Sequence, residues 1–303
     1  MREVIVGWDG GGTATKVVCV SPQGEVLARN RFGALNINGM GQLALEQTVR
    51  ECVRWMELQG ECVSLCIGTA GISNTQMVAC LNDALMQYGC RVSPLFVGDH
   101  EAALRGAVGT SGLILIAGTG TIAYGRDALG GTARAGGGGY LLDDEGSGYA
   151  IGRDILRAVL RAEDGRQKET ILQDLVKREI GDASRMGIVE YVYKNGVQKA
   201  NVAALAKLLD EAAVASDEAA CGIVEHAARE LCALVCAVVQ RLGMKETESA
   251  LLGGVLENCQ AVRGRLENML SKLPYYIHVI KPKHDAGYGA AMLAIEYAEP
   301  KCV

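Results

Sequence analysis

VGWDGGGTATK, residues 6–16, places three glycines directly after Asp9 and follows them with Thr-Ala-Thr-Lys. The residues before the glycines are mostly apolar and strand-like, so the glycines form the first turn of the chain. A tight hairpin is one interpretation, because Gly10 and Gly11 can supply the positive φ angles that such a turn needs. A phosphate loop is the other, because missing side chains let backbone N–H groups approach an anion closely.

The residues around this turn predict an antiparallel start to the fold. Residues 2–32 read as a strand, the glycine turn, a strand, a second turn at 21–24 (SPQG) and a third strand. P-loop and Rossmann units instead pass from their glycine-rich turn into a helix. Here the β-branched segment TKVVCV follows. The pattern argues against the commoner nucleotide-binding motifs without excluding a nucleotide.

The composition indicates a globular protein with one large domain or two of ordinary size. The chain has 303 residues, of which 49% are hydrophobic, 21% charged and only 5% aromatic. The net charge is −5 and no basic cluster is present, which gives no support for binding to nucleic acid or anionic membranes. No stretch approaches the roughly 18 apolar residues of a membrane helix, and no secretory signal precedes the first strand. We therefore expect a soluble, cytoplasmic protein.

Hydrophobic periodicity predicts two similar α/β halves. The first half reads β-β-β-α-β-α-β-α, with helices at 42–59 and 74–89. Residues 112–130 (GLILIAGTGTIAYGRDALG) then repeat the strand–turn–strand opening. Long helices follow from about 148 to 242, and the chain closes with the strands in ESALLGG and YIHVIK and a final helix.

The expected domains are 1–107, at the N-terminus, and 108–286, which binds the nucleotide. The helix within 287–303 is expected to pack back on the first domain. Matching openings of the two halves predict a duplicated fold with a cleft between them.

Three glycine turns then need one explanation: Gly10–Thr13, Gly118–Thr121 and Gly253–Gly254. Alone, each is more often a hairpin than a binding site. Each follows an apolar strand, however, and two carry threonine hydroxyls that can donate to phosphate oxygens. Their joint occurrence in two similar halves therefore favours phosphate binding.

The motifs DGGGTATK, IAGTGT and LLGGVLEN resemble the two phosphate motifs and the adenosine motif of the actin–hexokinase–heat-shock-chaperone ATPase superfamily. Residues 136–152, GGGGYLLDDEGSGYAIG, are similar to the Gly-Gly-Trp-Gly-x-x-x-Gly-Asp-Glu-Gly-Ser segment of the N-acetylglucosamine kinases, a branch of the BadF-type ATPases. The resemblance covers essentially the whole chain. It implies two ribonuclease H-like domains with mixed sheets around an interdomain cleft, a kinase that phosphorylates an amino sugar at its C6 hydroxyl, and a homodimer.

The resemblance also implies ATP and Mg²⁺ as cofactors. Asp9 is expected to orient Mg²⁺ through water. The expected nucleotide contacts are Gly11, Gly12 and Thr13 at the terminal phosphates, Gly118, Thr119 and Gly120 at phosphates from the second domain, and Gly253, Gly254 and Ala203 near adenosine.

The substrate residues follow from the same resemblance. Asp99, after the strand PLFVG and before the helix EAALRGA, matches the catalytic aspartate of the family. Asn36 in GALNINGMG, Gly137, Gly139 and Asp144 match residues that contact the sugar. N-acetylglucosamine is the expected substrate, with N-acetylmuramate and glucosamine as the related candidates.

The chemistry of these residue types agrees with a kinase. Phosphoryl transfer depends on positioning and on neutralising phosphate charge, which backbone N–H groups and Mg²⁺ supply without many basic residues. A carboxylate at a strand end suits the proton acceptor for the sugar hydroxyl. Asp99 could equally cap the following helix, and residues 143–145 (DDE) could be a solvated acidic turn. Lys16 is expected on the strand surface, and none of the four histidines is assigned a catalytic role.

Two positions depart from the family pattern. The family tryptophan, which stands beside the sugar and its N-acetyl group, is here Gly138, and the glycine before Asp-Glu-Gly-Ser is here Asp143. Losing an indole opens space, which suggests a larger or differently substituted sugar.

Eleven cysteines raise a rival hypothesis. In the other branch of the family, ATPase activators of reductases or dehydratases hold an iron–sulfur cluster between two subunits. No C-x-x-C pair is present here, and Cys232 and Cys236 are four residues apart on one helix face, so free buried thiols are expected. A non-catalytic sugar-sensing protein is the second rival, although the chain shows no DNA-binding segment before its first strand.

Overall fold

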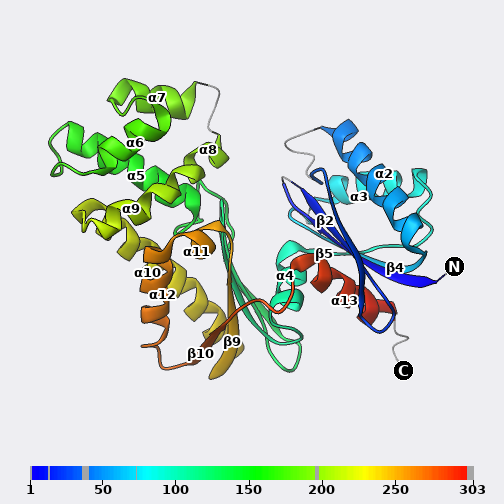
Figure 1. Ribbon diagram of the computed structural model, residues 1–303. Helices are drawn as coiled ribbons and strands as arrows, with labels where there is room; N and C mark the ends of the chain where they lie inside the picture. Colours follow the sequence, from blue (N-terminus) through cyan, green and yellow to red (C-terminus); the bar gives the residue numbers. More distant parts are fainter. Residues whose placement is uncertain (1, 13, 36–40, 73, 195–197, 299–303) are drawn as a thin grey trace. The chain divides into compact units, whose positions relative to one another are not determined.

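The computed structural model divides into two compact units (Figure 1). Unit 1 comprises residues 1–111 and 282–303, and unit 2 comprises residues 112–281. The predicted site residues Thr13 and Asn36 lie outside the described residues. Those described are 2–12, 14–35, 41–72, 74–194 and 198–298.

Unit 1 is built on a five-stranded mixed sheet. Its described elements are β1 (Glu3–Gly10), β2 (Thr15–Val20), β3 (Val26–Phe32), α2 (Gln42–Gln59), β4 (Glu61–Thr69), α3 (Thr75–Gln87), β5 (Leu95–Gly98), α4 (Asp99–Ala107) and α13 (Ala286–Ala298). The strand order is β3-β2-β1-β4-β5. β1 pairs antiparallel with β2 and parallel with β4. The first glycine turn closes the β1–β2 hairpin, where the Gly11 N–H donates to the Ala14 carbonyl at 3.0 Å.

Alternate residues of β1 pack on opposite faces of this sheet, as the two-residue period of a strand requires. Val4, Val6 and Trp8 are buried in a cluster with α2 and α3. Ile5 is buried in a second cluster, with α4 and α13. The approach of α13 is close, because a Cβ on Gly289 would lie 2.0 Å from the Ala102 carbonyl oxygen. The C-terminal helix thus completes the core of unit 1 (Figure 1).

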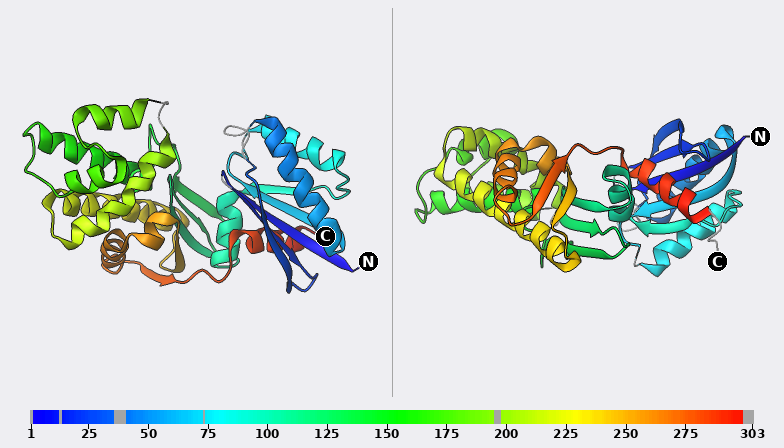
Figure 2. Two further views of the ribbon diagram at one scale, coloured as in Figure 1. Left: turned by 45° about the horizontal axis from the view of Figure 1, so that its top comes forward. Right: turned by 90° about the horizontal axis from the view of Figure 1, so that it is seen from below.

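Unit 2 repeats the same sheet and adds a helical region. Its described elements are β6 (Gly112–Ala117), β7 (Thr121–Arg126), β8 (Thr132–Gly136), α5 (Gly148–Glu163), α6 (Leu172–Ile180), α7 (Arg185–Tyr193), α8 (Lys199–Ala204), η1 (Leu205–Leu208), α9 (Leu209–Val214), α10 (Glu218–Leu242), β9 (Glu246–Leu252), α11 (Gly254–Asn258), α12 (Gln260–Leu270) and β10 (Tyr276–Ile280). α10 packs on β6, β7 and β8, with α12 beside it (Figure 2). Among the described helices, none combines the length and apolar character needed to cross a membrane.

The two sheets have the same topology, which confirms the predicted α/β class. In unit 2 the order is β8-β7-β6-β9-β10, so that β6 takes the place of β1. β6 is antiparallel to β7 and parallel to β9, as β1 is to β2 and β4. The element order predicted for the first half is also confirmed. β8 was not predicted, because its sequence TARAG lacks the β-branched and aromatic residues that mark a strand.

Candidate functional site

Asp9 and Asp99 lie at the carboxyl ends of parallel strands in unit 1. Asp9 is the penultimate residue of β1, and Asp99 follows directly after β5 as the first residue of α4. β4 lies between them, where Asp9 pairs with Gly68 and Thr69 pairs with Gly98. In open α/β sheets this edge is where ligands bind. The fold therefore brings two predicted site residues, 90 positions apart in sequence, to one functional edge.

Asp99 is held by its neighbour His100. Its Oδ1 accepts from the His100 N–H at 2.9 Å and lies 3.4 Å from His100 Nδ1. Burial acts to raise the pKa of Asp99, but the hydrogen bonds and charge of His100 outweigh it and hold the pKa below its usual value. The Asp99 side chain remains 47% exposed. It is therefore an ionised carboxylate that a ligand can reach, and His100, given no catalytic role from sequence, orients it.

Asp9 has a different environment. Burial raises the pKa of Asp9; Lys16 opposes this shift, and the negative charges of Asp99 and Asp285 add to it. Lys16 Nζ lies 4.0 Å from Asp9 Oδ2 and is half-exposed, in keeping with the predicted surface position. Asp285 was not predicted as part of this edge. It precedes α13 and accepts from the Tyr288 N–H at 2.9 Å.

Asp9→Asn is expected to raise the unfolding temperature at pH 7. The unfolded chain releases this proton near pH 4, whereas the folded chain retains it to a higher pH. Folded protein thus binds more protons between the two pKa values, and stability falls as the pH rises through that window. A neutral asparagine removes the penalty, so the gain should vanish below about pH 4. Thermal unfolding across pH tests this, with exposed Asp83→Asn as the control; an equal or lower Tm at pH 7 contradicts it.

The second glycine turn, residues 118–121, joins β6 to β7 in unit 2. The Gly118 N–H donates to the Gly120 carbonyl at 2.9 Å, and the Thr121 N–H donates to Asp144 Oδ1 at 3.0 Å. Within the described part of the chain, the N–H groups of Thr119 and Gly120 have no hydrogen-bond acceptor. Two adjacent free N–H groups beside a threonine hydroxyl form a natural anion-binding turn.

A cavity of about 450 Å³ opens beside this turn in unit 2. It brings together four of the residues predicted to contact the nucleotide, from three segments: Gly118, Thr119, Ala203 and Gly254. The remaining lining residues are Gly148, Ala200, Ala204, Ala206, Lys207, Val255, Asn258 and Cys259. Small side chains thus leave an open space next to free backbone N–H groups, as a nucleoside attached to phosphates requires.

The third glycine turn forms one wall of this cavity. Gly253 has a φ of 92°, and a Cβ there would lie 2.6 Å from the Ala117 carbonyl oxygen at the end of β6. Only glycine combines that conformation with so close an approach. Gly254 then begins α11, and its carbonyl accepts from Asn258 Nδ2 at 2.9 Å.

The loop after β8 contains both departures from the family pattern, and they touch one another. The Gly138 N–H donates to Asp143 Oδ2 at 3.1 Å, and a Cβ on residue 138 would lie 2.8 Å from the Asp143 Cβ. A side chain at 138 therefore conflicts with the side chain at 143 in this conformation. Gly137 and Gly139 flank the contact with φ angles of 75° and 91°.

Asp144 is not part of a solvated acidic turn. The expected contact with sugar hydroxyls stays a prediction; the residue is only 7% exposed, and its Oδ1 accepts from the Thr121 N–H. The contact ties the segment 144–147 to the turn 118–121. The sequence alone does not reveal the contact between Asp144 and Thr121, because only the fold brings the two segments together.

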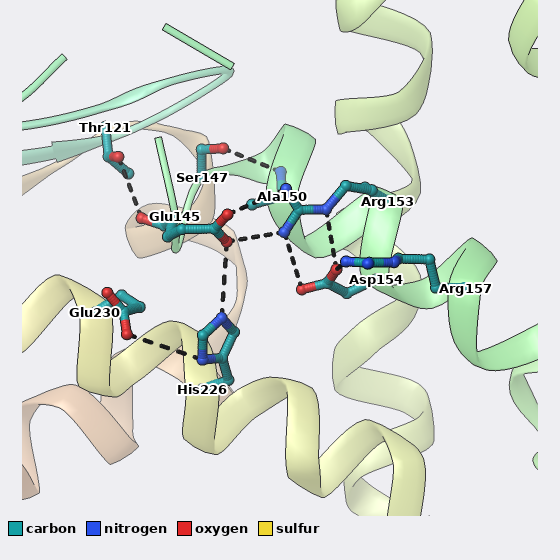
Figure 3. A network of polar contacts seen from close by, with 9 residues as sticks. All are labelled: Thr121, Glu145, Ser147, Ala150, Arg153, Asp154, Arg157, His226 and Glu230. Atoms are coloured by element: carbon teal, nitrogen blue, oxygen red, sulfur yellow. Dashed lines mark hydrogen bonds and ion pairs between the residues drawn. The ribbon is translucent and has the colours of Figure 1, made fainter. Parts of the chain in front are cut away.

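A polar network extends from this segment (Figure 3). Arg153 donates to both carboxylate oxygens of Glu145, at 3.1 and 2.8 Å, and to Asp154 at 3.0 Å. Burial acts to lower the pKa of Arg153, but these hydrogen bonds outweigh it and raise the pKa. Glu145, Asp154 and His226 also place potential metal ligand atoms within 4.8 Å of one another. A divalent cation there would have to displace the guanidinium, so we assign no metal to this cluster.

The described cysteines are free thiols, and only Cys221 is classed as exposed. Burial raises the pKa of Cys62 and Cys66 to about 12 and that of Cys232 to about 11. Thiols that stay protonated at neutral pH are poor nucleophiles and poor metal ligands. These three cysteines therefore act as small apolar residues, as the sequence predicted.

Two mixed sheets of one topology, each with a glycine turn after its central strand, give the chain the actin- and hexokinase-like fold of its structural neighbours. Residues 6–294 match the BadF/BadG/BcrA/BcrD ATPase family, and the chain belongs to this family.

Relatives match along the whole chain. The N-acetylmuramic acid/N-acetylglucosamine kinase of Clostridium acetobutylicum is 33% identical over 300 residues, covering 96% of this chain and 97% of the relative. The N-acetyl-D-glucosamine kinase of Dictyostelium discoideum is 29% identical and covers 97% and 98%. A crystal structure from Chromobacterium violaceum, of a protein proposed to be an N-acetylglucosamine kinase, has the same fold, with a TM-score of 0.74, 24% identity and coverage of 97% and 99%.

Proposed function

We propose that the protein transfers the γ-phosphate of ATP to the C6 hydroxyl of an amino sugar, N-acetylglucosamine or a close relative such as N-acetylmuramate or glucosamine. It is an ATP-dependent sugar kinase. The observation that carries the proposal is the cavity in unit 2, which gathers Gly118, Thr119, Ala203 and Gly254 beside two free backbone N–H groups. Its volume of about 450 Å³ is in the range of small-molecule sites.

Unit 2 binds the nucleotide in this proposal. The small residues of the cavity contact adenosine, with Gly254 in the wall and Gly253 directly before it. The N–H groups of Thr119 and Gly120 bind phosphate oxygens, and the hydroxyl of Thr119 adds a donor. Gly11 and Gly12 supply similar contacts from the β1–β2 turn of unit 1.

Unit 1 supplies the groups that activate the sugar hydroxyl. Asp99 accepts the proton of the attacking hydroxyl, for which an accessible, ionised carboxylate is suited. Asp9 is a partly buried carboxylate near two other acids, and such oxygen ligands fit Mg²⁺, directly or through water. When bound, Mg²⁺ neutralises charge on the transferred phosphate.

In this proposal, Gly137, Gly139 and the neighbouring loop bind the sugar. Asp144 adds a contact through its second carboxylate oxygen, Oδ2, because Oδ1 accepts from the Thr121 N–H. The Clostridium acetobutylicum relative is named for both N-acetylmuramic acid and N-acetylglucosamine. Glycine at 138 removes the indole of the family tryptophan, and the smaller Asp143 side chain lies against that position instead; this exchange favours acceptance of more than one amino sugar. N-acetylglucosamine remains the first substrate to test.

ADP formation from MgATP across a panel of sugars tests the function directly. The panel contains N-acetylglucosamine, N-acetylmuramate, glucosamine, N-acetylmannosamine and glucose. We expect turnover that depends on an amino sugar, with glucose as the poor substrate. Hydrolysis of ATP that is independent of sugar, or none at all, would reject the kinase and favour an ATPase activator.

A further inference from the structure

Asp144 has a positive φ, which is uncommon for residues other than glycine. Its φ is 68°, in the left-handed region that favours glycine. The side chain is nevertheless buried against the second glycine turn: Oδ1 accepts from the Thr121 N–H at 3.0 Å, and a Cβ on Gly120 would lie 2.9 Å from Oδ2. Such strain persists where the surroundings fix it, and it gathers at functional sites.

Glu145 contacts the same turn through its backbone. Its carbonyl oxygen accepts from Thr121 Oγ1 at 3.2 Å. Thr121 is therefore held twice, by the Asp144 carboxylate through its N–H and by Glu145 through its hydroxyl. These two bonds leave the N–H groups of Thr119 and Gly120 as the unused donors of the turn in the described structure.

Arg153 fixes Glu145 from the opposite side (Figure 3). Its guanidinium makes a two-bond contact with the Glu145 carboxylate, and Asp154 holds the same guanidinium through Nε. Paired hydrogen bonds of this kind restrict orientation more than a single ion pair does. The Arg153 side chain is 28% exposed and that of Asp154 is 19% exposed, so the contact is partly shielded from water. His226 Nε2 lies farther off, 3.7 Å from Glu145 Oε2.

We infer that Asp144 and Arg153 are positioning residues of the phosphate-binding turn: Asp144 directly, and Arg153 through Glu145, hold residues 118–121 in the conformation that presents the Thr119 and Gly120 N–H groups to a nucleotide phosphate. The inference rests on the proposed function, since it requires a nucleotide at this turn. It gives Asp144 a role in nucleotide binding that is separate from any contact with the sugar.

Substitutions at Asp144 separate the two roles. Asparagine keeps a carbonyl oxygen for the Thr121 N–H and tolerates a positive φ, so Asp144→Asn should bind MgADP within about twofold of the parent protein. Alanine has no acceptor and no preference for this φ. Asp144→Ala should therefore weaken MgADP binding about tenfold or more. A residue that served the sugar alone would raise KM for the sugar in the alanine variant and leave MgADP affinity unchanged.

Arg153→Met tests the indirect contact. It keeps most of the stem but removes the guanidinium, and we expect the Kd for MgADP and the KM for ATP to rise together by about tenfold, with the KM for the sugar unchanged. Arg153→Lys restores the charge with one contact and should recover part of the affinity. Arg157→Met is the matched control: it lies one turn along α5, is 64% exposed and bonds Asp154 but not Glu145.

Calorimetric titration of the full chain with MgADP measures these affinities without turnover, and thermal unfolding checks each variant. If Arg153→Met does not fold, Arg153→Lys and Glu145→Gln provide the comparison. Parent-like MgADP affinity in Asp144→Ala and in the Arg153 variants overturns the positioning role alone. Failure of the parent protein to bind MgADP overturns the nucleotide site itself, and with it this inference.

Discussion

Asp99→Asn is expected to lower kcat about 10²–10⁴-fold, the usual contribution of a general base. Asparagine keeps an oxygen that can accept from the His100 N–H, so the start of α4 is preserved. What is lost is the negative charge that accepts the hydroxyl proton. MgADP affinity and the unfolding temperature should stay close to those of the parent protein.

The N-cap of α4 is Gly98, so Asp99 is not the capping residue that the sequence allowed, and the same variant distinguishes catalysis from a structural role in the first turn of the helix. If Asp99 served only the helix, asparagine, itself a good residue at helix starts, would leave turnover nearly unchanged. Initial rates with the best sugar, together with thermal unfolding, decide between the two roles. Asp83→Asn, an exposed carboxylate of the same unit, is the matched control and should retain full activity. Activity within a few-fold of the parent protein would contradict the assignment of Asp99 as the base.

The sequence predicted those features that depend on local patterns. Alternating and helical periodicities predicted the strands and helices of residues 1–107 in their observed order. The glycine turns were recognisable because each follows an apolar strand. The cavity residues Thr119 and Ala203 were expected from the family resemblance rather than from local chemistry. Neither residue type marks a site by itself, since threonine and alanine are common in turns and helices.

Features that depend on distant contacts were not predicted. The return of the C-terminal helix to the first domain was expected, but the place of Asp285 near Asp9, just before that helix, was not. In the sequence, Arg153 is one of several polar residues of an amphipathic helix. Its contact with Glu145 is evident only in the structure. Asp144 was expected as a sugar ligand, and its bond to the Thr121 N–H depends on a segment 23 residues away. In each case the feature depends on a contact between two segments, which the pattern of a single sequence does not reveal.

Ala203→Phe is expected to weaken MgADP binding by about 100-fold or more, because an aromatic ring would fill space that a nucleoside needs. Ala203 lies on α8, lines the cavity together with Gly254, and is only partly buried. The larger side chain therefore enters the cavity rather than the core of unit 2. Because the base and ribose bind equally in ground and transition states, the KM for ATP should rise more than kcat falls.

Asn201→Phe provides the control on the same helix, since Asn201 is exposed and does not line the cavity. It should bind MgADP like the parent protein. Ala203→Leu, with a smaller side chain, should give an intermediate loss if the effect is one of volume. Unchanged affinity in Ala203→Phe, with normal thermal unfolding, would place the adenosine elsewhere and remove the main support for the nucleotide site. A graded loss from leucine to phenylalanine, absent in Asn201→Phe, ties the affinity to the space beside the turn 118–121.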